Sequence, residues 1–374
     1  MKKKIVFLSG TRADFGKMKP LIQVVHDSSE FEYAIFVTGM HLLEVYGLTV
    51  IEIEKCGFKN IHRYSNYTSE TTMDLTLART IDGFSNFIKQ EKPDLIIVHG
   101  DRPEALAGAI VGSLNNILVG HIEGGEISGT VDELIRHSVT KLSHIHFVSN
   151  ETAANRLVQM GELEQSVFTI GSPDLDILFS DFLPDIQKAK SYYEIPFEKY
   201  AILLFHPVTT EAEFIKQYAD ALAKALLEDN TNYVVIYPNN DLGSTAILDS
   251  FNNFKGDRRF KIFPSLRFEY FITLLKHAQF LIGNSSAGIH EAPYLGIPTI
   301  NIGRRQENRD INNEEIIHTP NEKEDILEGI FKAKKLKIEP KKPIFNGKAA
   351  DKFLTVLQSE KLWQLDQQKQ FRDL

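Results

Sequence analysis

Cysteine is almost absent from this chain of 374 residues, which has a single thiol at Cys56. One cysteine cannot form an internal disulfide, and it leaves no group of thiolates that could hold a structural zinc ion. Such sparing use of cysteine is typical of proteins in a reducing compartment. We therefore expect a cytoplasmic protein.

The sequence also lacks long hydrophobic runs and long basic tracts. The apolar run Ile5–Leu8, which follows Met1–Lys4, is too short for the core of a signal peptide or for a membrane span. The net charge is −8 at pH 7, and no lysine- or arginine-rich tract would match the surface of a nucleic-acid duplex. We expect neither a membrane nor a nucleic acid among the partners.

What the chain does have is a regular alternation of apolar runs and amphipathic stretches, which is typical of βαβ units on a parallel sheet. The pattern restarts at Tyr200 after a mixed segment, and the length allows two cores. We predict an α/β protein with two Rossmann-like domains facing a cleft. The first spans residues 1–171 and the second 172–354, and a C-terminal helix at 355–374 packs back on the first domain.

The expected elements place polar residues at strand ends, where open α/β sheets bind their ligands. The expected strands are Lys4–Leu8, Tyr33–Thr38, Leu95–His99, Leu118–Ile122, Ile145–Val148, Val167–Ile170, Ala201–Phe205, Tyr233–Tyr237, Phe260–Phe263, Phe280–Gly283 and Thr299–Ile302. The expected helices include Met18–His26, Met73–Gln90, Pro103–Leu114 and Glu151–Met160.

One strand end is typical of an anion site. The strand at Phe280–Gly283 runs into Ser285 and Ser286, where a helix is expected to begin with free N–H groups and two hydroxyl donors. Glu291, further along the same helix, could accept hydrogen bonds from the two hydroxyls of a ribose. The alternative is an ordinary helix cap that binds nothing.

The first strand ends in a glycine turn, Ser9–Lys17, that holds Arg12 and Lys17 before a helix. This turn resembles phosphate-binding turns, yet it matches neither the P-loop nor the dinucleotide fingerprint, which argues against an ATPase or a nicotinamide enzyme. The alternative for Arg12 is a plain surface cation.

Three carboxylates follow the next strands. Asp101 and Glu123 lie at strand ends, and Asp132 opens a helix, so they could converge at one rim. Their mutual repulsion would then raise a pKa into a range useful for acid or base work. A simple helix cap remains the alternative for Asp132.

The second half contributes a histidine and an arginine loop. His206 ends an apolar strand, where it could protonate or stabilise a leaving phosphate, or else hydrogen-bond in an interdomain contact. The loop Gly303–Arg309 contains three arginines. Arg305 and Arg309 suit a diphosphate or a salt bridge, whereas a solvated loop is the alternative for Arg304.

Two other patterns indicate metal binding only weakly. Asp174 and Asp176 form a short Asp-x-Asp, which is common, and His144 and His146 lie two residues apart on a short strand, as chance alternation allows. We expect no metal ion.

Together these motifs resemble the UDP-N-acetylglucosamine 2-epimerases, and specifically the hydrolysing branch of bacterial sialic acid synthesis. The resemblance covers nearly the whole chain. Glu-Gly-Gly-Glu at 123–126 is similar to the hydrolysing branch, and we expect no sugar-kinase activity. The motifs that carry it are Gly10–Lys17, Val37–His41, His99–Arg102, His121–Glu126, Asp132–His137, His206–Thr210, Gly283–Ser286 and Gly303–Gln306.

The resemblance implies a glycosyltransferase B-like architecture with UDP bound mainly by the second domain, and no cofactor. Asp101, Glu123 and Asp132 match acidic residues of proton transfer, without any assignment of acid and base. His206 completes the catalytic set, and we expect a homo-oligomer, either a dimer or a tetramer. The residues expected to bind UDP or the sugar are Arg12, Lys17, His41, Arg102, Asn239, His206, Ser285, Ser286, Glu291 and Arg305.

The expected reaction converts UDP-N-acetylglucosamine and water to N-acetylmannosamine and UDP. The proton on carbon 2 is weakly acidic, so departure of the diphosphate must help its removal, and water then adds to the resulting glycal. A 2,4-diacetamido-trideoxy sugar nucleotide is the rival substrate. The other hypotheses are a glycosyltransferase and a non-catalytic sugar-nucleotide sensor. Three carboxylates beside a negatively charged diphosphate argue against the sensor.

Overall fold

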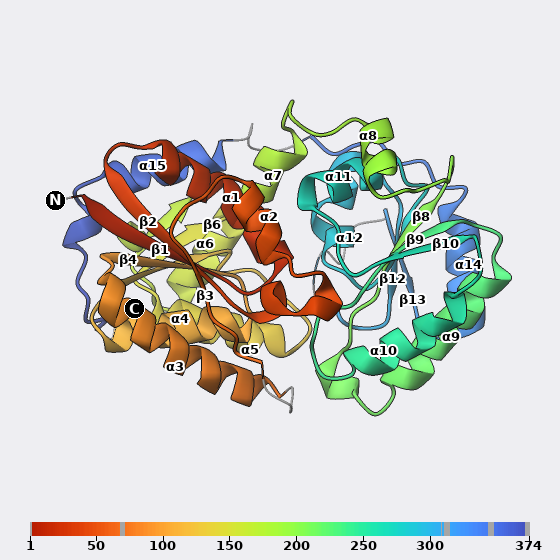
Figure 1. Cartoon of the computed structure of the whole chain (residues 1–374), viewed down its shortest axis with the longest axis horizontal. Coiled ribbons are helices and arrows are strands. Elements are labelled where there is room, and N and C mark those ends of the chain that lie inside the picture. Colours follow the sequence, from red (N-terminus) through yellow and green to blue (C-terminus); the bar gives the residue numbers. More distant parts are fainter. Residues whose placement is uncertain (1, 68–71, 308, 310–314, 343–347, 371–374) are drawn as a thin grey trace. The chain divides into compact units, whose positions relative to one another are not determined.

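The computed structural model describes residues 2–67, 72–307, 309, 315–342 and 348–370. The chain forms two compact units (Figure 1). Unit 1 comprises Met1–Glu126, Asp132–Phe179 and Phe345–Leu374, and unit 2 comprises Ile127–Val131 and Ser180–Ile344.

Unit 1 is built on a sheet of parallel strands in the order β3-β2-β1-β4-β5-β6-β7. Its central strands β4, β5 and β6 are buried along nearly their whole length because helices cover both faces of the sheet. The strands are β1 (Lys3–Ser9), β2 (Phe31–Val37), β3 (Ile61–Arg63), β4 (Leu95–His99), β5 (Leu118–Ile122), β6 (Ile145–Val148) and β7 (Val167–Thr169).

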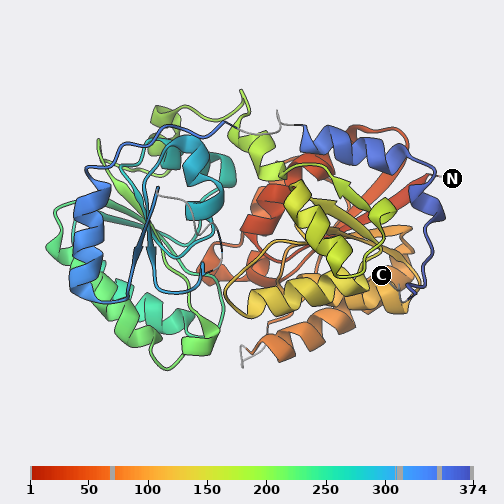
Figure 2. The same ribbon diagram turned by 180° about the vertical axis from the view of Figure 1, so that it is seen from behind.

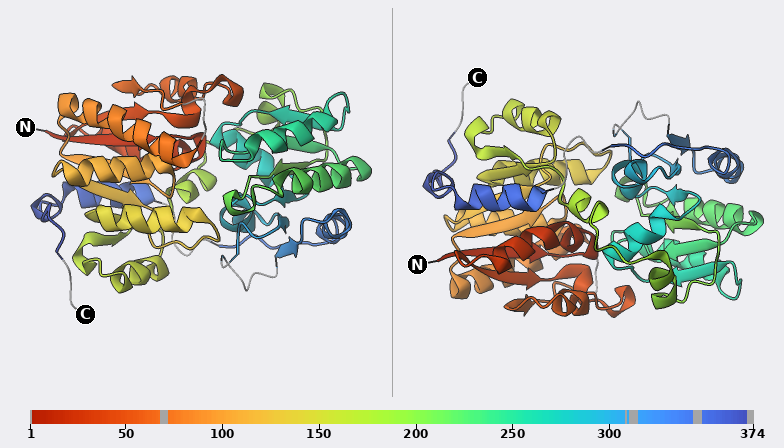
Figure 3. Two further views of the ribbon diagram at one scale, coloured as in Figure 1. Left: turned by 90° about the horizontal axis from the view of Figure 1, so that it is seen from below. Right: turned by 90° about the horizontal axis from the view of Figure 1, so that it is seen from above.

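The helices of unit 1 form two layers. Figure 3 shows α3, α4 and α5 over one face of the sheet in the view from below, and α1 and α15 over the other face in the view from above. The helices are α1 (Arg12–Asp27), α2 (Val50–Lys55), α3 (Met73–Glu91), α4 (Pro103–Leu114), α5 (Val131–Leu142), α6 (Glu151–Gln159), α7 (Pro173–Leu178) and α15 (Ala349–Gln358).

Helix α15 belongs to the core of unit 1 although it lies near the end of the chain. The ring of Phe353 is fully buried, with its centroid 4.8 Å from that of Phe147 and 6.4 Å from that of Phe7. The helix spans Ala349–Gln358, whereas the sequence predicted a helix at 355–374. A short 3-10 turn at Leu362–Gln364 follows.

The boundary between the units also differs from the predicted one at Gly171. Unit 1 continues to Phe179 because α7 packs against α1 and α15. The Asp176 carboxylate on α7 accepts hydrogen bonds from the backbone N–H groups of Ala349 (3.0 Å) and Ala350 (2.9 Å), so α7 caps the returning helix.

Unit 2 has a second parallel sheet, in the order β10-β9-β8-β11-β12-β13. Figure 2 shows it from behind, with α14 outside the sheet. Its strands are β8 (Ala201–Leu204), β9 (Tyr233–Ile236), β10 (Phe260–Phe263), β11 (Leu281–Gly283), β12 (Thr299–Ile302) and β13 (Ile316–Thr319). Its helices are α8 (Ile186–Tyr192), α9 (Ile215–Glu228), α10 (Ser244–Phe251), α11 (Phe268–Lys276), α12 (Ala287–His290), α13 (Ala292–Leu295) and α14 (Lys323–Ala333).

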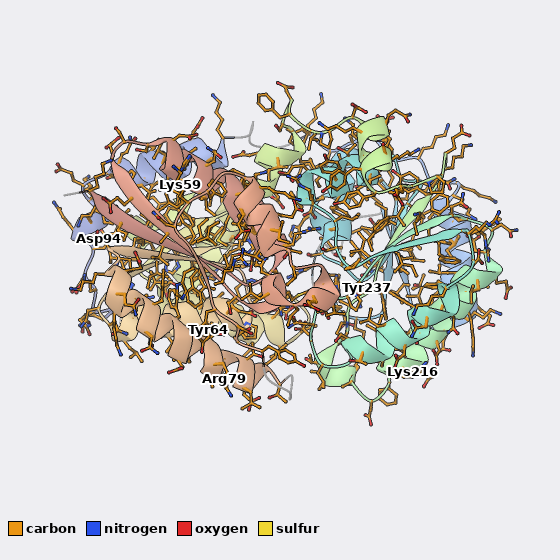
Figure 4. All side chains as sticks on the ribbon, viewed as in Figure 1. Lys59, Tyr64, Arg79, Asp94, Lys216 and Tyr237 are labelled. Atoms are coloured by element: carbon orange, nitrogen blue, oxygen red, sulfur yellow. The ribbon has the colours of Figure 1, made fainter. Side chains whose placement is uncertain are left out.

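Two α/β units with parallel sheets confirm the predicted fold class. Figure 4 marks the two kinds of strand end: Asp94 directly precedes β4, at an amino end, and Tyr237 directly follows β9, at a carboxyl end. Asp94 ties the amino end of β1 through Lys3 Nζ (2.8 Å) and the backbone N–H of Lys4 (2.9 Å). The polar groups of interest lie at the carboxyl ends.

Within the part of the chain that the structure describes, no helix is long and apolar enough to cross a membrane.

Candidate functional site

The turn after β1 is organised by a capping box. Thr11 Oγ1 accepts from the backbone N–H of Asp14 (3.2 Å), and the Asp14 carboxylate accepts from the N–H of Thr11 (3.0 Å), which satisfies two donors at the helix start. Helix α1 therefore begins at Arg12, earlier than the predicted Met18. Arg12 and Lys17 lie on its first turns.

His41, which we expect in the substrate site, supports this turn from inside unit 1. The imidazole is fully buried, with Nε2 2.9 Å from Ser9 Oγ and Nδ1 2.6 Å from Thr49 Oγ1. Burial, together with the nearby Arg12 charge, lowers the pKa of His41 to about 3, so the ring is neutral at physiological pH. Both ring nitrogens are engaged inside unit 1.

Glu123 lies at the carboxyl end of β5 in a left-handed conformation, with φ of 63°. Such a backbone is uncommon for a residue other than glycine and is found at functional sites. Lys17 Nζ donates to both carboxylate oxygens, at 2.9 and 3.1 Å, and His99 Nε2 lies 3.2 Å from Oε2. Glu123, one of the three predicted acids, thus has contacts with Lys17 and His99 that the sequence did not predict.

Lys17, for which substrate binding stays a prediction, is a partner of carboxylates in this structure. Its ammonium also lies 3.5 Å from Oδ2 of Asp174, which is 2% exposed. The carboxylates of Asp174 and Asp176 contact different groups, because Asp176 caps α15. Among the described residues, no group of three or more histidine, cysteine, aspartate or glutamate side chains is arranged to hold a metal ion.

Asp101 and Asp132 are connected through α5. Arg136, a buried residue of α5, forms an ion pair with Asp101 and donates from Nη1 to the carbonyl of Glu126 (3.1 Å). Asp132 lies four residues before Arg136, on the same face of the helix. The expected repulsion between carboxylates is offset, since Asp101 and Glu123 each have a cation partner.

Two further side chains support the ends of β4 and β5. His121 Nε2 donates to the carbonyl of Gly100 (2.8 Å), next to Asp101, and burial lowers the pKa of His121 to about 3. Arg102, expected at the substrate, lies with Nε 3.5 Å from Oε2 of the buried Glu104.

In unit 2, Asn284 connects the end of β11 to the end of β8. Its Oδ1 accepts from the backbone N–H of His206 (2.7 Å), and its Nδ2 donates to the His206 carbonyl (2.8 Å). The strands can approach because residue 283 is glycine: a Cβ there would lie 1.8 Å from the Leu204 carbonyl oxygen. Asn284 is part of the motif Gly283–Ser286, but the sequence pattern did not predict its contacts with His206.

The orientation of His206 is set by Asn239. The backbone N–H of Asn239 donates to His206 Nδ1 (3.0 Å), so the neutral ring carries its proton on Nε2. Asn239, which we expect to contact the substrate through its side chain, contacts His206 through its backbone. The result is an imidazole that offers an N–H donor from Nε2.

The arginine loop is attached to the same asparagine. Arg305 Nη1 (3.2 Å) and Gln306 Nε2 (2.8 Å) both donate to the carbonyl of Asn284, and Arg309 Nη1 donates to Gln306 Oε1 (2.9 Å). Arg309 Nε also bonds the carbonyl of Ile127. Arg304 is solvated, with 70% of its side chain exposed and Glu307 as its ion-pair partner. The structure thus brings Arg305 and His206 to one hydrogen-bonded framework.

The expected helix after Ser286 is interrupted, which corrects the prediction that Glu291 lies on the helix that begins there. The chain forms two four-residue helices, α12 and α13, that meet at Glu291. Pro293 has no N–H for the carbonyl of Ile289, and its ring would clash there in a continuous helix. The dipole of so short a helix is small, so hydroxyl groups and backbone N–H groups are the donors that remain at Ser285 and Ser286.

The two histidines on β6 have structural partners. His146 Nε2 lies 3.0 Å from Oε2 of Glu162, and His144 Nδ1 accepts from the backbone N–H of Val119 (3.0 Å). Glu162 also accepts from Lys141 and Lys369. Glu162 lies 16 positions after His146 along the chain, so the fold brings the two side chains together.

Comparisons with known proteins agree on one family. The model of the family UDP-N-acetylglucosamine 2-epimerase matches residues 23–358. The chain is 46% identical over 376 residues to a Neisseria meningitidis UDP-N-acetylglucosamine 2-epimerase, covering 100% of this chain and 99% of that protein. It is 33% identical to a Legionella pneumophila UDP-N,N'-diacetylbacillosamine 2-epimerase (hydrolyzing), covering 96% of each.

A solved structure supports the fold. The Methanocaldococcus jannaschii UDP-GlcNAc 2-epimerase, in complex with UDP-GlcNAc and UDP, superposes with a TM-score of 0.79 at 22% identity, covering 95% of this chain and 99% of that one. At 22% sequence identity, this structural similarity shows the fold alone.

Proposed function

Because the chain belongs to the UDP-N-acetylglucosamine 2-epimerase family, we propose that it is a hydrolysing member that converts UDP-N-acetylglucosamine and water to N-acetylmannosamine and UDP. The observation that carries the proposal is the Glu123 carboxylate at the carboxyl end of β5, which accepts hydrogen bonds from Lys17 and has His99 Nε2 3.2 Å away. A carboxylate fixed in this way is suited to proton transfer in a buried setting.

The first step of the proposed reaction breaks the bond between carbon 1 and the diphosphate oxygen, and the electron pair leaves with UDP. Unit 2 supplies the groups that stabilise this charge: the Nε2–H of His206, the Arg305 guanidinium and the hydroxyls of Ser285 and Ser286. The Nδ1 contact from Asn239 favours a neutral His206, so the ring stabilises the phosphate by donating a hydrogen bond.

Loss of UDP gives carbon 1 cationic character, which makes the carbon 2 proton removable by a carboxylate of unit 1. The electrons of the C2–H bond then form the double bond of a 2-acetamidoglucal. Water adds at carbon 1 and a proton returns to the opposite face of carbon 2, which gives N-acetylmannosamine. Asp101, Glu123 and Asp132 are the proposed proton donors and acceptors, and Arg12 and Glu291 are proposed to contact the nucleotide.

A second substrate is favoured by one specific observation, the 33% identity to the diacetylbacillosamine enzyme. Its substrate class is the 2,4-diacetamido-trideoxy sugar nucleotide. Both candidates share the chemistry at carbons 1 and 2, and they differ at carbons 4 and 6. The same elimination would serve either one.

Product analysis by proton NMR, with UDP-N-acetylglucosamine and the diacetamido analogue side by side, tests the proposal. We expect free N-acetylmannosamine and UDP with only water present. Accumulation of UDP-N-acetylmannosamine would contradict the hydrolysing assignment, and turnover of only the analogue would transfer the proposal to that substrate. Activity that needs an acceptor sugar would indicate a glycosyltransferase.

A further inference from the structure

Asp174 is a buried carboxylate that the proposed reaction does not yet use. It lies in the first turn of α7, with Pro173 before it, and it is 2% exposed. Ser172 Oγ bonds the Asp174 carboxylate and lies 3.4 Å from Oε1 of Glu123. The Ser172 hydroxyl therefore lies between the two acids, with its single proton donated to Asp174, the nearer acceptor.

Lys17 bridges the same two acids. Its ammonium donates to Glu123 at 2.9 and 3.1 Å and lies 3.5 Å from Asp174 Oδ2, and its side chain is 13% exposed. Charges that are this sheltered from water are weakly screened, so each carboxylate influences how the ammonium acts on the other. Asp174 thus influences Glu123 through the Lys17 ammonium.

We propose that Asp174 is a positioning residue for proton transfer at Glu123. It fixes the ammonium of Lys17 and takes up part of its charge, which leaves Glu123 a better proton acceptor than an exclusive pair with Lys17 would. Asp174 itself does not contact the substrate in this scheme. The inference rests on the proposed function, because it assigns Asp174 to the elimination step.

Asp176 provides a matched control two residues away. It lies on the same short helix, and its carboxylate accepts the N–H groups of Ala349 and Ala350 at the start of α15. Asp174→Asn and Asp176→Asn therefore make the same chemical change on one helix. The first removes the charge beside Lys17, and the second removes the charge that caps α15.

The test compares both variants in the full chain. We expect Asp174→Asn to lower kcat about tenfold with KM and the affinity for UDP unchanged, a loss typical of an interaction that acts only in the chemical step. Asp176→Asn should lower the melting temperature while kcat per folded molecule stays at the wild-type value. Wild-type kcat in Asp174→Asn would overturn the inference, as would a loss explained entirely by unfolding.

A double-mutant cycle with Lys17→Met shows whether Asp174 acts through Lys17. We expect Asp174→Asn to cause little further loss once Lys17 has been replaced, because coupled residues are not additive. Additive losses would overturn the proposed route through the ammonium.

A third measurement does not depend on turnover. In protein carrying 13C-labelled lysine, the ε-carbon signal of Lys17, identified by its loss in Lys17→Met, should shift in Asp174→Asn and stay in place in Asp176→Asn. An unmoved signal would contradict the inference. Absence of wild-type turnover on any UDP-sugar would instead contradict the proposed function, while the Lys17 signal would still decide the role of Asp174.

Discussion

At the scale of single residues, His206 is held by two asparagines that act on different parts of it. Asn284 fixes its main chain on both sides, and the backbone of Asn239 fixes its ring through Nδ1. Because Nδ1 accepts a hydrogen bond, the donor that remains is Nε2–H. The tautomer of His206 follows from a contact between residues 33 positions apart.

We predict that His206→Ala lowers kcat by about 100-fold and weakens UDP binding by less than tenfold. The reason is that the ring donates to charge that grows on the leaving phosphate in the transition state, as oxyanion donors do. Kinetics and calorimetry on the same variant check this.

Two amide variants serve as controls for this prediction. His206→Gln, whose amide can reach the place of Nε2, should recover more kcat than His206→Asn, whose amide resembles Nδ1. A large loss of UDP affinity with unchanged kcat would make His206 a residue that only holds the nucleotide.

At the scale of elements, α5 is attached to the rest of unit 1 by two side chains. Arg136, in the middle of the helix, pairs with Asp101, and Lys141, near its end, donates to Glu162 (2.7 Å). Glu162 also accepts from Lys369, in the chain after α15. Burial alone would raise the pKa of Glu162, but the hydrogen bonds from His146, Lys141 and Lys369 lower it to about 2.

Glu162→Gln is expected to reduce the free energy of unfolding by about 1–3 kcal/mol at pH 7, because His146, Lys141 and Lys369 then lose a buried charged acceptor. The folded-state pKa lies below the usual value, so this stabilisation is present above about pH 4.5 and is lost as the pH falls toward 2. Urea unfolding at several pH values measures it. The exposed Glu164 gives the control, and Glu164→Gln should stay within about 0.5 kcal/mol of wild type. A constant difference between pH 7 and pH 3 would contradict the linkage.

At the scale of the whole molecule, the chain leaves unit 1 at Phe179 and returns to it with α15. Phe353 on α15 completes the core of unit 1 between Phe7 and Phe147. The folding of unit 1 therefore requires both ends of the sequence.

Phe353→Ala is expected to destabilise unit 1 by about 3–5 kcal/mol, the usual cost of removing a buried aromatic ring. Scanning calorimetry should show one transition at lower temperature and leave the transition of unit 2 in place. Phe331→Ala offers a control, since Phe331 is 59% exposed and should change stability little. An unchanged thermogram for Phe353→Ala would contradict the packing role of α15.

The proposed reaction as a whole can be followed by isotope. N-acetylmannosamine formed in heavy water should carry deuterium at carbon 2, because the proton that returns comes from groups that exchange with solvent. Retention of the original hydrogen would contradict elimination. Asp101→Asn, Glu123→Gln and Asp132→Asn should leave UDP binding largely intact and suppress both incorporation and turnover, and full activity in any one would remove that residue from the proton-transfer set.

Local sequence patterns determined most of the secondary structure of this protein. Largely apolar strands followed by amphipathic helices predicted the order of the main elements, because the spacing of apolar residues indicates which faces are buried. The edge strands β3 and β13 were missed, since they are short and contain polar residues. The start of α1 was also missed, although the capping pair Thr11 and Asp14 was a readable signal.

The tertiary structure alone decided which polar groups meet. Lys17 and Glu123 are 106 positions apart, and Asp176 meets Ala349 across 173 positions. Strand ends predict which edge of a sheet a side chain lies near, but not its partner, because that depends on how helices pack over the sheet. For the same reason His41, Lys17 and Asn239 looked alike as candidate ligands in the sequence, and packing gave each of them a different neighbour.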